Sequence, residues 1–146
     1  MYRASSTKLG NHVLKAEGIK RPQVRNHQAH HIIPLQLAER RDRTNLEDYD
    51  KEWNCLFLLM SDDAIIHFGS HPNYTEYVES LIDGYMRTHN GFTFLQAAME
   101  VADGVKAWYN ANIAKLRQLE VYNVSINNIE YLMGVVNDRI NNYIKN

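Results

Sequence analysis

The stretch Ala29-His30-His31-Ile32-Ile33-Pro34 decides how the rest of the chain is interpreted. Residues 28–33 are predicted to form a short strand, which ends at Pro34 because proline cannot donate a hydrogen bond to a sheet. A second strand is expected over the apolar run 54–60, which begins at Asn54. Two further histidines follow at His67 and His71. The predicted order is therefore strand, strand and helix, with histidines at both ends.

These histidines suit the binding of a divalent ion and the activation of water. An imidazole titrates near neutral pH, as a general base must, and its neutral form is a common metal ligand. Neighbouring residues on a strand point to opposite sides. One site that holds both His30 and His31 therefore requires a twist or a bulge in the strand, or one of the two roles must be filled from across the groove that holds the site. The spacing of His67 and His71 suits two ligands on one helical face, but Pro72 disfavours a helical conformation at His71. We therefore expect His67 at the end of a short helix over 61–67 and His71 at the N-cap of the next helix.

With these elements in this order, the chain resembles the AHH nucleases, a branch of the HNH/endonuclease VII superfamily. The resemblance covers roughly residues 8–83, including Gly18-Ile19-Lys20-Arg21-Pro22 and the stretch from His67 to Tyr74. It implies an α+β fold with a ββα-metal (His-Me finger) core. It also implies individual roles: general base for His31, orientation of that base for Asn54, and metal coordination for His30, His67 and His71.

The chain is expected to be mostly helical and to have two parts. Residues 1–90 would form the nuclease core with an N-terminal helix over 6–17, and residues 91–146 a C-terminal helical hairpin packed on or beside the core. Other helices are expected over 35–43 and 72–86. Apolar residues at helical spacing from Leu95 to Leu116 predict a long amphipathic helix beginning near Thr93, and Ser125 is expected to cap the last helix.

The formal net charge of −1 conceals an uneven distribution. Residues 1–43 hold nine Lys/Arg and three Asp/Glu, whereas residues 44–146 hold seven and fourteen. A basic N-terminal third is suited to a phosphate backbone, although a solvated surface explains its arginines equally well. The candidate phosphate contacts are Arg21, Arg25, Arg40, Arg41 and Arg43.

The resemblance implies an endonuclease that hydrolyses phosphodiester bonds of DNA or RNA through one divalent metal ion. Three imidazoles favour Zn, Ni, Co or Mn over Mg, yet related sites work with Mg, so the ion stays open among these. DNA is expected as substrate ahead of RNA, although no residue decides between them. The family setting further implies an antibacterial toxin domain of a secreted polymorphic protein, with a cognate immunity protein as a partner.

Neither a signal-peptide pattern nor an apolar run of about 18 residues, as a membrane span needs, is present in the sequence. We therefore expect a location in the bacterial cytoplasm or delivery into target cells as part of a larger toxin. Two other functions stay open. One is a non-catalytic module that binds nucleic acid or protein and has a structural zinc site. The other is a protein–protein adaptor centred on the acidic hairpin, with a decayed nuclease core.

Overall fold

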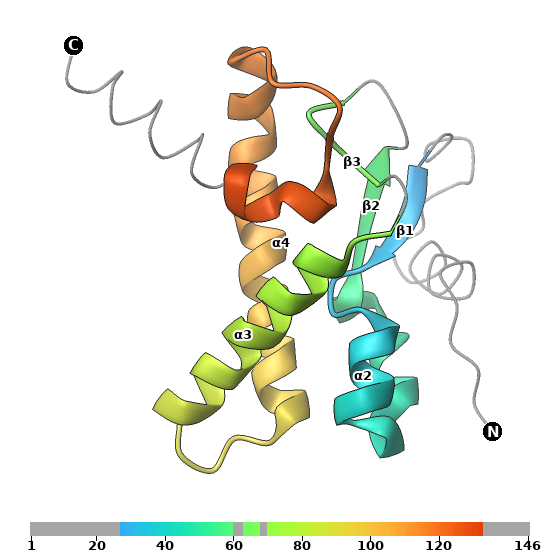
Figure 1. Ribbon diagram of the computed structural model, residues 1–146, viewed down its shortest axis with the longest axis vertical. Coiled ribbons are helices and arrows are strands. Elements are labelled where there is room, and N and C mark those ends of the chain that lie inside the picture. Colours follow the sequence, from blue (N-terminus) through green and yellow to red (C-terminus); the bar gives the residue numbers. More distant parts are fainter. Residues whose placement is uncertain (1–26, 60–62, 68–69, 133–146) are drawn as a thin grey trace.

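The computed structural model describes residues 27–59, 63–67 and 70–132 (Figure 1). The helix predicted over 6–17 lies outside these residues. The elements in chain order are β1 (His27–His31), α2 (Leu35–Arg41), the 3₁₀ segments η2 (Arg43–Tyr49) and η3 (Glu52–Asn54), β2 (Cys55–Leu59), β3 (Ile65–Ile66), α3 (Pro72–Thr88), α4 (Phe94–Gln118), β4 (Val124–Ser125) and η4 (Ile126–Asn128). The fold is therefore mixed α+β and mostly helical, as predicted.

The four strands form one mixed sheet in the order β1-β2-β3-β4. β1 and β2 are antiparallel, and their register runs from His27 opposite Leu59 to His31 opposite Cys55. β3 lies parallel to β2, and β4 lies parallel to β3. Both predicted strands are confirmed, and because β1 and β2 are paired in full, the position of His31 is fixed relative to the start of β2.

The helical turns predicted over 61–67 are wrong in the part that the structure describes, because Ile65–Ile66 is strand β3. The acidic Asp63 before it does not begin a helix. Instead, Asp63 accepts hydrogen bonds from the Ala64 amide and from the Arg117 guanidinium of α4. Two β-branched residues between β2 and β4 gain ladder partners on both sides, and this pairing outweighs the local helix signal.

The helices α3 and α4 cross each other and lie on one side of the sheet (Figure 1). Pro72 begins α3, as predicted, because its missing N–H has no partner to lose at a first helical position. Thr93 and Gln96 cap α4 reciprocally through a capping box. Small residues on the inner face of α4 bring it close to the sheet, and they share one core with Ile32, Ile33 and Tyr74: they are Ala97, Ala98, Val101, Ala102 and Val105.

The segment after α4 returns to the sheet before it becomes helical. Val124–Ser125 form β4, which the sequence did not predict. The Ser125 hydroxyl then accepts a hydrogen bond from the Asn127 amide and caps helical turns that the structure describes as far as Leu132, so the predicted helix start is confirmed. Within the described part of the chain, no helix combines the length and apolarity needed to cross a bilayer.

Candidate metal centre and active site

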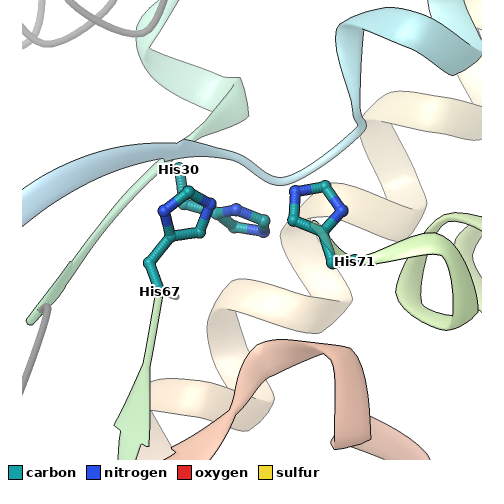
Figure 2. Close-up of side chains that lie close together, drawn as sticks. All are labelled: His30, His67 and His71. Atoms are coloured by element: carbon teal, nitrogen blue, oxygen red, sulfur yellow. The ribbon is translucent and has the colours of Figure 1, made fainter. Parts of the chain in front are cut away.

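Three imidazoles from separate segments meet in one cluster. His30 lies on β1, His67 follows β3 directly, and His71 is the N-cap residue of α3. Figure 2 shows the three rings facing one another. One nitrogen from each lies within 4.8 Å of the others, which suits a single ion bound between them. Strand pairing and helix capping therefore bring together residues that are up to 41 positions apart in the chain.

The His30 side chain supplies the strongest indication that this cluster binds a ligand. His30 is 1% exposed, and neither of its ring nitrogens has a hydrogen-bond partner among the described residues. A buried polar group without a partner is costly, and a metal ion bound between the three rings would give one of the two His30 nitrogens a partner. Burial holds the pKa of His30 well below its ordinary value, and the charges of His67 and His71 lower it further. The ring is therefore neutral and keeps the lone pair that a ligand needs.

The other two rings are also suited to coordination. Burial lowers the pKa of both His67 and His71, which keeps these imidazoles neutral as well. Nδ1 of His67 lies 2.7 Å from Oε1 of Gln28, which is two residues before His30 on the same face of β1. Since an amide oxygen only accepts, this bond places the hydrogen on Nδ1 and leaves Nε2 of His67 for an ion.

His31 faces a different partner from its neighbour. Its Nε2 lies 2.9 Å from Oδ1 of Asp50, and the two side chains are only 6% and 0% exposed. Burial lowers the pKa of His31, although the hydrogen bond and charge of Asp50 oppose this shift. The charge of His31 in turn lowers the pKa of His30 and of His67. The β1–β2 register runs without interruption through both histidines, so they project to opposite sides of the strand.

Asn54 is fully buried and bonds to backbone rather than to the His31 ring. Its Oδ1 accepts from the Ile33 amide at 2.6 Å, and its Nδ2 donates to the carbonyls of Ile33 and Tyr49 at 3.0 and 2.8 Å. Ile33 follows His31 by two residues, and Tyr49 precedes Asp50. The Asn54 side chain therefore links the backbone next to His31 to the backbone next to Asp50.

Asp50 is the residue at this site that the sequence did not identify. It lies in the acidic connection over 44–52, where four of the nine residues are Asp or Glu, and the sequence pattern does not distinguish one of these carboxylates from another. A carboxylate placed four residues before Asn54 is the only local signal, and it is weak.

The structure places the arginines predicted to contact phosphate in different surroundings. Arg40 and Arg41 form ion pairs with carboxylates of α3, with nitrogen–oxygen distances of 2.8 to 2.9 Å to Glu79 and Asp83. Hydrogen bonds to Asp83 and then Glu79 raise the pKa of Arg41. A phosphate would have to compete with these carboxylates. Arg43 is exposed, and Arg21 and Arg25 lie outside the described residues.

Comparison with known proteins gives one match. A family model described as a nuclease family of the HNH/ENDO VII superfamily with conserved AHH matches residues 12–100. This span contains the Ala29-His30-His31 triplet, Asn54 and both remaining histidines of the cluster. The order β1, β2 and α3, with histidines on β1 and at the start of α3, agrees with the ββα-metal fold of that superfamily. Neither a curated protein nor a solved structure matches the chain.

Proposed function

Because the chain belongs to the AHH nuclease family of the HNH/ENDO VII superfamily, we propose that it is a metal-dependent endonuclease acting on phosphodiester bonds of DNA or RNA. The observation that carries this proposal is the buried His30 ring, whose nitrogens have no hydrogen-bond partner among the described residues and which faces two further imidazoles. His31, which is paired with the carboxylate of Asp50, directly follows His30 in β1. A candidate metal ligand and a candidate base are therefore consecutive residues.

His30, His67 and His71 would hold the ion. When bound there, a divalent ion supplies Lewis-acid stabilisation of charge on the phosphoryl and leaving oxygens. Three neutral nitrogen donors favour Zn, Ni, Co or Mn over Mg, which prefers oxygen. The same donor set is compatible with a structural zinc site, so activity and stability have to be measured separately.

His31 would act as the general base. With Nε2 bonded to Asp50, its other nitrogen, Nδ1, takes a proton from the attacking water. The water oxygen forms a bond to phosphorus, the phosphorus–oxygen bond to the leaving group breaks, and the leaving oxygen takes up a proton from solvent. Burial favours this role because it lowers the pKa of His31 and keeps the ring neutral at neutral pH.

The test is cleavage of plasmid DNA and total RNA by metal-stripped protein resupplied with Mg, Mn, Ni or Zn. His31→Ala is compared with His89→Ala, which removes an exposed histidine at the end of α3. We expect His31→Ala to lose at least about 100-fold in rate, as loss of a general base typically does, while His89→Ala cleaves normally. The variant should keep its circular dichroism and its metal stoichiometry.

Two results would contradict the proposal. Full activity in His31→Ala would exclude this residue as the base. Absence of cleavage by the wild type with every ion, together with unfolding on chelation, would favour the structural zinc site instead.

We further propose that the protein acts as an antibacterial toxin effector domain neutralised by a cognate immunity protein, with DNA as its preferred substrate. The support is the resemblance of Ala29–Pro34 and of His67–Tyr74 to the AHH nucleases. Induced expression in bacterial cytoplasm should arrest growth and degrade the chromosome with the wild type but not with His31→Ala. Normal growth with well-expressed wild-type protein would contradict this setting.

A further inference from the structure

Asp50 lies at the end of η2 with its carboxylate directed at the candidate base. We propose that Asp50 is a positioning residue that fixes the His31 imidazole in the tautomer with hydrogen on Nε2, so that Nδ1 faces the water. This inference rests on the proposed role of His31 as the base. It adds a buried carboxylate to the residues on which the reaction depends.

The hydrogen bond itself determines the tautomer. An ionised carboxylate can only accept, so at 2.9 Å the Nε2 atom of His31 must carry the hydrogen. The lone pair then belongs to Nδ1. In the opposite tautomer, a nitrogen lone pair would face a carboxylate oxygen with both side chains buried, and this contact would have no hydrogen between the two atoms.

The surrounding chain keeps Asp50 in this position. Its amide donates to the Glu47 carbonyl at 3.1 Å. The preceding residue, Tyr49, is held at two points: its carbonyl accepts from Asn54 at 2.8 Å, and its hydroxyl donates to Asp42 at 2.6 Å. The backbone of His31 is fixed independently by its pairing with Cys55. Both partners are therefore positioned before any substrate binds.

Asp50 is separate from the candidate metal ligands. Among the described residues, the group with ligand atoms close enough to share an ion comprises His30, His67 and His71, without Asp50. Removing the carboxylate should consequently leave metal binding intact. We expect the main effect on the proton transfer, because the positive charge that His31 gains on accepting a proton lies next to this carboxylate.

The experiment compares Asp50→Asn with Asp48→Asn in the full chain loaded with Zn²⁺ or Mn²⁺. Asn has the shape of Asp, but it lacks the charge, and its amide can donate to a nitrogen lone pair and so stabilise the wrong tautomer. Asp48 is a matched control because it lies two residues away, is 39% exposed and pairs with Lys51. We expect Asp50→Asn to lower kcat by about 100-fold or more with KM changed by less than about threefold, and Asp48→Asn to cleave like the wild type.

Two measurements separate positioning from a general structural role. In the Zn²⁺-loaded protein labelled with ¹⁵N-histidine, long-range ¹H–¹⁵N correlations should show His31 protonated at Nε2 in the wild type. In a His31→Ala background, Asp50→Asn should change the residual rate by less than about twofold, because a residue that acts through His31 has nothing left to position.

The inference is overturned if the wild-type ring carries its hydrogen on Nδ1, a result that needs no variant to fold. It is also overturned if Asp50→Asn cleaves as fast as Asp48→Asn. Failure of the proposed function is a different result, since the wild type would then cleave with none of the ions, or His31→Ala would cleave like the wild type.

Discussion

Replacing Asn54 by alanine should destabilise the protein far more than its size suggests. The side chain is fully buried and satisfies three backbone groups, namely the amide and carbonyl of Ile33 and the carbonyl of Tyr49. Each lost bond costs about 1 kcal/mol, and a buried group left without a partner costs up to about 3 kcal/mol. Allowing for water entering the space, we expect the free energy of unfolding to fall by roughly 3 to 6 kcal/mol.

This loss is large against the total stability of a single domain, which is about 5 to 15 kcal/mol. For a chain of 146 residues it corresponds to a fall in Tm of roughly 10 °C or more. Thermal unfolding followed by circular dichroism and urea titration would measure it. Asn112→Ala is the matched control, because Asn112 is half-buried and donates one hydrogen bond, at 2.8 Å, to the Trp108 carbonyl within α4.

We expect the control to lose less than about 1 kcal/mol, since its carbonyl partner also accepts within the helix. Equal losses in Asn54→Ala and Asn112→Ala would refute the reasoning, because they would mean that the three backbone groups find other partners at no cost. A large loss of stability should be accompanied by lower activity at temperatures where the variant is still folded. Asn54 joins the segments that carry His31 and Asp50, so its loss should loosen both.

Two further predictions concern metal affinity and acid stability. Gln28→Ala should weaken Zn²⁺ binding by about tenfold in competition with a coloured chelator, because residues that hydrogen-bond to ligating histidines typically contribute this much. The control is Gln36→Ala, which changes an exposed glutamine. Equal Zn²⁺ affinities of the two variants would contradict the role of the Gln28–His67 bond. Burial raises the pKa of Asp63, but hydrogen bonds from Arg117 and the Ala64 amide outweigh it, so the folded-state pKa lies below its ordinary value. The stabilisation is therefore complete above the unfolded-state pKa of about 3.9 and is lost as the pH falls through the folded-state value. The Tm difference between wild type and Asp63→Asn should be constant above about pH 5 and shrink below it; a difference that grows on acidification would contradict this.

The elements that the sequence predicts well are those with local signals. Pro34 is the N-cap residue of α2, Pro72 begins α3, and Thr93 caps α4, and each of these residues acts through its own backbone or side chain. The helix of 25 residues after Thr93 has apolar positions at helical spacing over its whole length. The family resemblance can also be found in the sequence, because it rests on short motifs in a fixed order, among them the contiguous Ala29-His30-His31 triplet.

The elements that it did not predict depend on distant partners. β3 and β4 have only two residues each, and each exists because a neighbouring strand supplies its hydrogen bonds. Asp50 presents the same difficulty at the level of a side chain. Nothing near it in sequence distinguishes it from Asp48, and it becomes the partner of His31 only after η2 packs against the end of β1.

The segment that follows the family match also holds the site together. The match ends at residue 100, within α4. Arg117, near the end of that helix, donates two hydrogen bonds to Asp63, and β4 pairs with β3, so the strand before His67 is held on both sides. Asn127 accepts hydrogen bonds from the first amides of α3, immediately after His71. Two of the three imidazoles are thus positioned by residues beyond the matched region. The C-terminal segment is therefore part of the structural support of the candidate metal centre, and substitutions in it should weaken metal binding even though it supplies no ligand among the described residues.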